Sequence, residues 1–212
     1  MIWYPYEQLK TMKAPYEIVD ANGVYLYTKD QKMIDSVSSW WSVIHGYKHP
    51  VINQAIISQV EKFSHVMLGG LTHEPARKLS EKLASWLPGD LDYCFFSDSG
   101  SVAVEVSLKM ALQYYMNRGD EKRTMILALE HAYHGDTFKT MEAGDDEDYH
   151  FVLKAYGTSP YVVHIPTETA ALEEAFEKYH DRLNCMLVEP LLQGAGGMRM
   201  YDVSFLKKAR EL

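Results

Sequence analysis

The chain has 212 residues, of which 47% are hydrophobic and 12% aromatic, enough for a packed core in one large domain or slightly more. Its 21 Lys and Arg residues oppose 29 Asp and Glu residues, which gives a net charge of -8, and no basic run is present. These values exclude nucleic acid as an expected partner, because its recognition needs a basic surface.

The predicted elements alternate between strands and helices along the chain. Their boundaries follow from the hydrophobic period, from Pro50 at a helix start and from Thr72 as an expected helix cap. In chain order we expect hairpin strands at 23–28 and 32–35, helices at 50–64 and 72–86, a strand at 93–96, a helix at 102–117, strands at 124–129 and 161–165, a helix at 170–179, a strand at 185–189 and a helix at 203–212. The alternation predicts an α/β fold with a mostly parallel sheet flanked by helices. Residues 143–159, which include an acidic run, are expected to form a surface excursion.

The N-terminus and the two cysteines indicate a cytoplasmic protein without a membrane partner. The first six residues lack the basic segment and apolar core of a secretory signal, and no window reaches the roughly 18 apolar residues that span a bilayer. Cys94 and Cys185 lie in apolar, strand-like runs and form no CxxC pair. This placement favours buried thiols in a reducing compartment over a disulfide or a metal site.

The most specific local feature is the turn Ser97-Asp98-Ser99-Gly100-Ser101, between the expected buried strand and the following helix. A tight, hydroxyl-rich turn at a helix start directs backbone N–H groups and hydroxyls to one point, with the positive end of the helix dipole behind them. Such a point binds a phosphate group. The structural alternative is an N-cap at Ser99 or Ser101 and a simple turn glycine at Gly100.

Two further polar groups follow expected strands, at the carboxyl ends where open α/β sheets bind ligands. Tyr133 lies among small and titratable residues at 130–136 and can stack on a planar ring, although a packing role is an equal alternative. Glu189 closes a strand and precedes the glycine-rich run 193–197. Its carboxylate can orient a ring substituent or pair with a cation, with a structural hydrogen-bonding role as the equal alternative.

Together these motifs resemble the first half of a class III, fold type I pyridoxal-phosphate aminotransferase. The resemblance is carried by residues 98–111, 133–138 and 189–190. Further matching runs at 2–6, 38–47, 65–73 and 193–201 extend it over the whole chain and are similar to the family members that act on 8-amino-7-oxononanoate in biotin biosynthesis. The implied cofactor is pyridoxal 5'-phosphate.

The resemblance implies a cofactor role for five residues. Gly100 and Ser101, with Ser99 beside them, would hold the cofactor phosphate. Tyr133 would lie on the pyridoxal ring and border the substrate, and Glu189 would sit beside the cofactor.

The resemblance also implies a substrate pocket shaped by Tyr6, Trp40 and Trp41 together with Tyr133. Apolar aromatic walls suit the long aliphatic chain of an oxononanoate. Without the resemblance, Trp40 and Trp41 would be expected as an ordinary core pair.

By the same resemblance, residues 1–48 contribute to a second, smaller domain, and residues 49–212 form the first half of the cofactor-binding domain. The family continues beyond the equivalent of Leu212 with the lysine that bonds the cofactor, the aspartate that pairs with the pyridinium nitrogen and an arginine for the substrate carboxylate. None of the three can be placed here. The last helix, capped by Asp202, also lacks a stop signal, so we expect a chain that breaks off within a domain and is inactive alone.

Three lysines could be mistaken for the missing one. Lys109 belongs to the helix that follows the phosphate turn, whereas Lys139 and Lys154 fall in or near irregular segments. We expect all three to be solvated surface lysines. Lys139-Thr140 also departs from the Gly-Ala expected there, which predicts a differently shaped loop near Tyr133.

The implied partners are 8-amino-7-oxononanoate, an amino donor (S-adenosylmethionine or lysine) and a second copy of the chain, with residues 65–73 near the subunit interface. Two alternatives stay open: another class III enzyme that takes an ω-amino acid or amino-ketone, and a non-catalytic module that binds a phosphate ligand or a partner. A metal hydrolase is disfavoured, because His45-x-x-x-His49 and His131-x-x-His134 lack a third carboxylate ligand.

Overall fold

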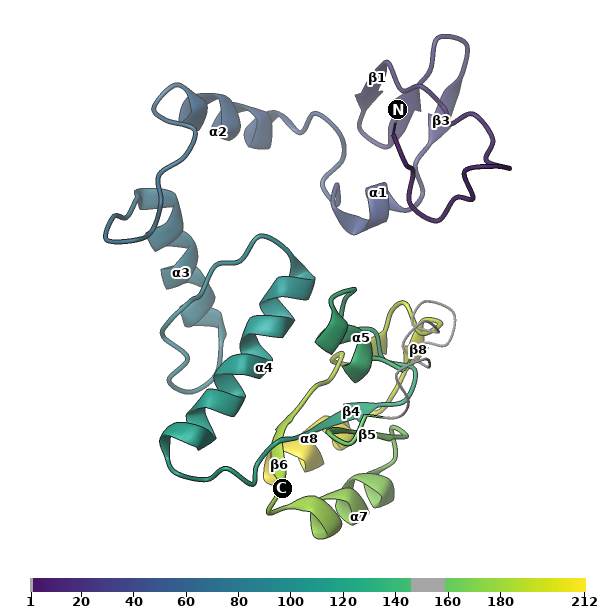
Figure 1. The fold of residues 1–212 in the computed structure, drawn as a ribbon. Helices are drawn as coiled ribbons and strands as arrows, with labels where there is room; N and C mark the ends of the chain where they lie inside the picture. Colours follow the sequence, from purple (N-terminus) through teal and green to yellow (C-terminus); the bar gives the residue numbers. More distant parts are fainter. Residues whose placement is uncertain (1, 146–158) are drawn as a thin grey trace. The chain divides into compact units, whose positions relative to one another are not determined.

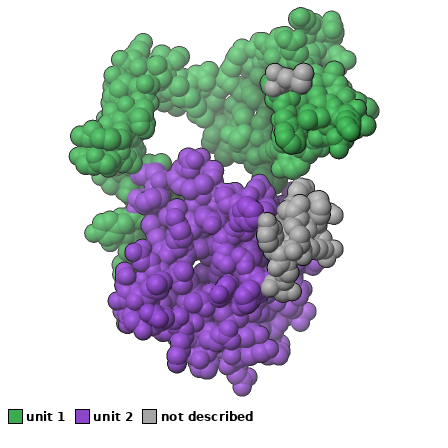
Figure 2. All heavy atoms as spheres, viewed as in Figure 1, with its two compact units in different colours: residues 1–93 green, residues 94–212 purple. Residues whose placement is uncertain are grey.

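The computed structural model describes residues 2–145 and 159–212, which divide into two compact units, 1–93 and 94–212 (Figure 2). The division at 48/49 stays a prediction about domains. Most of the expected surface excursion lies outside the described residues. Its first residue, Ala143, is the buried end of a helix.

The strands of the first unit form an antiparallel sheet in the order β1-β2-β3 (Figure 1). They are β1 (Asp20–Asn22), β2 (Tyr25–Tyr27) and β3 (Lys32–Ile34). The predicted hairpin is confirmed as β2 and β3, and the Thr28 hydroxyl closes its turn by accepting the N–H of Gln31 at 3.0 Å. Strand β1 was not expected from the sequence.

Two helices of the first unit match predicted ones. Helix α2 (Pro50–Val60) begins at the expected proline but ends before residue 64, and α3 (Glu74–Trp86) ends where expected. The expected cap Thr72 is wrong by one residue. His73 is the N-cap instead, because its Nδ1 accepts the N–H three residues further along at 3.3 Å.

The short element α1 (Ser38–Trp41) is a left-handed turn rather than an ordinary helix. All four residues have positive φ, at 49°, 46°, 51° and 64° in chain order. For non-glycine residues this region costs roughly 1–2 kcal/mol per residue, because Cβ approaches the following carbonyl oxygen. No residue pattern in the sequence predicted it.

The second unit is built on a parallel sheet with strand order β5-β4-β6. Its strands are β4 (Met125–Leu129), β5 (Val162–Ile165) and β6 (Leu183–Met186). The central strand β4 is buried along its whole length, and the period of two sends its residues alternately to opposite faces. The predicted parallel α/β architecture is confirmed.

Helices cover both faces of this sheet (Figure 1). Helices α7 (Thr169–Tyr179) and α8 (Val203–Glu211) pack on the face that presents the odd-numbered residues of β4. Helix α4 (Gly100–Asn117) packs on the face that presents the even-numbered ones. Among the described residues, the buried ones all belong to this second unit.

Three smaller elements of the second unit were not predicted. Helix α5 (Phe138–Ala143) follows the loop after β4 and begins with a capping box between Thr137 and Thr140. Strands β7 (Leu192–Gln193) and β8 (Arg199–Met200) form an antiparallel hairpin around the glycine-rich run.

Two strand predictions are corrected. Residues 93–96 form no strand: Tyr93 is 97% exposed, and no strand among the described residues pairs with this run to satisfy a ladder. The strand expected at 185–189 lies at β6, so Glu189 follows the strand end by a short loop. Cys94 and Cys185 are partly buried and are not joined in a disulfide, and burial raises the pKa of Cys185 to about 11.

Truncation of the central strand tests the role of this core. Leu127 is fully buried in β4, so Leu127→Ala is expected to lower the free energy of unfolding by about 2–5 kcal/mol. Met116→Ala, on the exposed side of α4, is the control and should change it by only about 0.5 kcal/mol. Urea denaturation measures both, and equal effects would contradict this account of the core.

Candidate active site

The N-terminus of α4 carries the predicted phosphate turn. Ser99 is its N-cap, and the Ser99 hydroxyl oxygen accepts the N–H of Val102 at 3.2 Å. Among the described residues, no acceptor is recorded for the N–H groups of Gly100 and Ser101. A Cβ added at Gly100 would meet no atom within 4 Å, so the first turn borders open space. Two backbone donors at the positive end of a helix dipole suit an anion.

The loop after β4 is fixed to this turn. The Asp136 N–H donates to the Ser101 hydroxyl oxygen at 3.0 Å, and the Thr137 hydroxyl donates to the Glu105 carboxylate at 2.7 Å. Gly135 makes the approach possible, because a Cβ there would lie 2.4 Å from the Ser101 Oγ, and its φ of +124° is unfavourable for other residues. The α4 turn and the residues around Tyr133 therefore form one site.

Glu189 joins that loop to the one after β6. Its Oε1 accepts the Tyr133 N–H at 3.0 Å, and its Oε2 accepts the Gly194 N–H at 2.9 Å. The Tyr133 hydroxyl donates to Asp136 at 2.8 Å. These bonds bring Ser101, Tyr133 and Glu189 into one connected group, and they give Glu189 the structural hydrogen-bonding role that the sequence left open.

The glycine-rich hairpin packs against the same loop. The Gln193 side chain is buried and donates to the Glu130 carbonyl at 2.7 Å. A Cβ at Gly196 would lie 1.9 Å from the His131 carbonyl oxygen, so only glycine fits there. Sequence reasoning missed the roles of Gln193 and Asp136, and the only available signal was the glycine-rich run itself.

The expected substrate residues Tyr6, Trp40 and Trp41 belong to the first unit. The rings of Tyr6 and Trp40 meet edge to face, with centroids 5.3 Å apart. The three side chains are 70%, 65% and 59% exposed, so Trp40 and Trp41 are not a core pair in the structure. Their role toward a substrate stays a prediction.

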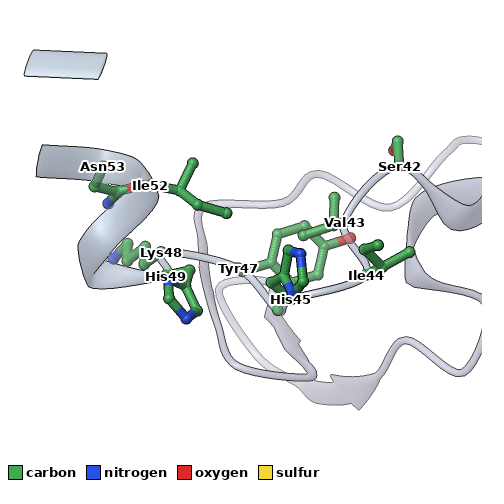
Figure 3. A pocket seen from close by; sticks show the side chains of 10 residues that line it. Ser42, Val43, Ile44, His45, Tyr47, Lys48, His49, Ile52 and Asn53 are labelled. Atoms are coloured by element: carbon green, nitrogen blue, oxygen red, sulfur yellow. The ribbon is translucent and has the colours of Figure 1, made fainter. Parts of the chain in front are cut away.

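The first unit contains a small hollow that none of these residues lines (Figure 3). It has a volume of about 210 Å³ and is lined by the segment 42–49 with Ile52 and Asn53. Ligand pockets usually measure roughly 300–1,000 Å³, so it is small for a cofactor. His45 and His49 lie here with ring centroids 5.9 Å apart, and in the described part of the chain no third His, Cys, Asp or Glu joins them in a metal-binding group.

Lys109 fits the expectation of a solvated surface lysine, whereas Lys139 is only partly exposed. Lys109 is exposed on α4. Lys139 forms an ion pair with Glu142 at 2.7 Å, and Lys154 lies outside the described residues.

None of the described helices is long and apolar enough to cross a membrane.

The comparisons with known proteins agree with this geometry. The family model for class III aminotransferases matches residues 6–212. The chain therefore belongs to the class III aminotransferase family, whose members depend on pyridoxal phosphate and share this α/β fold.

Named relatives refine the comparison. An adenosylmethionine-8-amino-7-oxononanoate aminotransferase from Buchnera aphidicola is 41% identical over all of this chain and 52% of its own length. The Saccharomyces cerevisiae enzyme of the same name is 40% identical over all of this chain and 50% of its own length. A crystal structure with that name from Methanocaldococcus jannaschii is 32% identical, with a TM-score of 0.91 over 99% of this chain and 49% of that one. The chain thus spans about half the length of these relatives.

Substitution of Gly135 tests the close approach to Ser101. In the full-length natural protein, Gly135→Ala should weaken pyridoxal phosphate binding by about tenfold or more, because the new methyl group displaces the Ser101 hydroxyl. Gly119→Ala is the matched control, since Gly119 also has positive φ but its Cβ would meet nothing within 4 Å. Equal affinities of the two variants in a fluorescence titration would contradict the proposed site.

Substitution of Glu189 tests the bridge between the two loops. Glu189→Gln replaces one acceptor oxygen with an NH₂ group, which leaves the N–H of Tyr133 or Gly194 without an acceptor. We expect the free energy of unfolding to fall by roughly 1–3 kcal/mol. Glu174→Gln, on the exposed side of α7, serves as the control in the same denaturation experiment. An unchanged stability of Glu189→Gln would show that the bridge is dispensable.

Proposed function

We propose that the natural protein containing this chain transfers an amino group to 8-amino-7-oxononanoate, which yields 7,8-diaminononanoate, a step of biotin biosynthesis. The observation that carries the proposal is the connected group of Ser101, Tyr133 and Glu189 in a chain of this family. The names of relatives at 40–41% identity supply the substrate. Because the chain spans about half the length of those relatives, the activity is proposed for the longer natural protein.

The residues present fit pyridoxal phosphate. The Gly100 and Ser101 N–H groups, which have no recorded protein acceptor among the described residues, would bind its phosphate. The Ser99 hydroxyl accepts a bond as the helix cap and still has a proton to donate there. When bound, the cofactor acts as an electron sink for the proton shift that moves the amino group.

Tyr133 and Glu189 would then fix the position of the cofactor ring. Tyr133 is held at its backbone by Glu189 and at its hydroxyl by Asp136, so its ring is preorganised for stacking. Glu189 acts beside the cofactor mainly through Tyr133, because both of its oxygens already accept backbone N–H groups.

The substrate pocket is proposed to include Tyr6, Trp40 and Trp41 as apolar walls for the aliphatic chain of the acceptor. Their exposure in the first unit leaves these faces available for contact. The amino donor is proposed to be S-adenosylmethionine, as in the names of the relatives, with lysine as the second candidate.

We further propose a homodimer in the cytoplasm. Large apolar side chains of the first unit are exposed, among them Val51, Ile56 and Val60 along α2, and an apolar surface of this kind is typical of an interaction site. Cys94 and Cys185, which form no disulfide with each other, fit a reducing compartment.

Incubation of the full-length natural protein with 8-amino-7-oxononanoate, pyridoxal phosphate and each amino donor tests the proposal. We expect 7,8-diaminononanoate by mass spectrometry. Turnover of an ω-amino acid or amino-ketone instead would show another class III activity, and ligand binding without turnover would show a non-catalytic module.

A second sample, residues 1–212 alone, should give no product and no stable visible absorption band after gel filtration with the cofactor. In family members, the lysine that bonds the cofactor is expected in the half of the chain that follows the equivalent of Leu212. No residue of this chain would therefore bond the cofactor covalently. Product formation by residues 1–212 would contradict this account.

A further inference from the structure

The left-handed turn α1 is held by a carboxylate that the proposed reaction does not use. The Asp35 Oδ2 accepts the Ser39 N–H at 2.8 Å, and its Oδ1 accepts the Val37 N–H at 3.1 Å. The Tyr47 hydroxyl donates to the same Oδ2 at 2.6 Å and also contacts the Ser39 hydroxyl. These bonds, with that from Tyr47 foremost, hold the pKa of Asp35 below its usual value.

Asp35 and Tyr47 are themselves fixed to the antiparallel sheet. The Asp35 N–H donates to the Val24 carbonyl at 2.9 Å, directly after strand β3. Tyr47 exchanges two backbone hydrogen bonds with Gly23, at 2.8 and 3.1 Å, in the turn between β1 and β2. The turn is therefore held from two points of the same antiparallel sheet. We call Asp35, Ser39 and Tyr47 the latch.

The latch holds backbone geometry that α1 would not adopt by local preference. Four successive residues with positive φ, none of them glycine, need a surrounding structure that fixes them. The strained turn places an exposed ring. Trp40 meets Tyr6 edge to face, and both side chains remain largely exposed. Tyr6 also has positive φ, at 61°. Strain that places exposed aromatic rings does not serve a hydrophobic core and is typical of a functional site.

We propose that Asp35 is a positioning residue, which through Ser39 and Tyr47 fixes Trp40 in the orientation that receives the aliphatic chain of the amino acceptor. The inference rests on the proposed function, because that function makes Trp40 a wall of the substrate pocket. Asp35 itself touches neither substrate nor cofactor in this account. Its removal should therefore change acceptor binding more than the chemical step.

The test compares Asp35→Asn and Tyr47→Phe with the control Asp30→Asn in the full-length natural protein. Asp30 is exposed in the β2–β3 turn of the same sheet, and no side-chain hydrogen bond is recorded for it among the described residues. Tyr47→Phe keeps the ring and removes only the hydroxyl, so it remains informative if Asp35→Asn folds poorly. Two readouts are measured: the ¹⁹F resonance of 5-fluorotryptophan at position 40, assigned with Trp40→Phe, and the KM and kcat for 8-amino-7-oxononanoate.

We expect both latch variants to shift or broaden the Trp40 resonance and to raise KM about fivefold or more, with kcat at saturation within about twofold of the natural protein. Asp30→Asn should change neither readout. An unchanged resonance in both variants would overturn the latch. A shifted resonance with unchanged KM would overturn the substrate role of the turn while the transaminase activity itself stands.

Failure of the proposed function gives a different result. If the natural protein forms no diamine at all, the substrate role falls with that function. The ¹⁹F shift then decides whether Asp35 holds the turn, because this readout needs no activity.

Discussion

The carboxylate of Glu189 is the interaction on which the site of the second unit depends. One oxygen accepts the Tyr133 N–H after β4, and the other accepts the Gly194 N–H after β6. The two loops leave neighbouring parallel strands at the same edge of the sheet, so a single side chain can reach both. A carboxylate suits this place because it offers acceptors to two backbone donors that would otherwise lack partners. The bridge keeps Tyr133 beside the N-terminus of α4.

The sheet below supplies the rigidity that such a site requires. Strand β4 is buried along its length and packs with alternate residues against α7 and α8 on one face and against α4 on the other. The loop that carries Tyr133 leaves this strand directly, and Gly135 lets it lie against Ser101. The proposed phosphate turn and Tyr133 are thus anchored to the same strand and helix. Phosphate binding and ring orientation would follow from one packed core.

In the first unit, hydrogen bonds rather than a buried core hold the candidate residues in place. None of its described residues is buried to the extent of the β4 core, yet the latch gives α1 a defined backbone. Hydrogen bonds from an antiparallel sheet replace a hydrophobic core as the source of local order there. Tyr6 and Trp40 are paired and exposed, which leaves their rings available for the proposed contact with the substrate.

The sequence alone determined the alternating α/β order and the parallel sheet and placed the turn before α4, although α4 begins at Gly100 rather than Val102. It also supplied Ser101, Tyr133 and Glu189 as candidates, because hydrophobic period and turn chemistry are local properties. It failed at residues 93–96, where an apolar run forms no strand without a neighbour, and at α1, where the left-handed turn depends on a distant hydroxyl. Only the tertiary structure decided that Glu189 binds two backbone N–H groups and that Gly135 lies against Ser101. Such contacts join residues far apart in the chain, and no spacing within the sequence records which loops the sheet brings together.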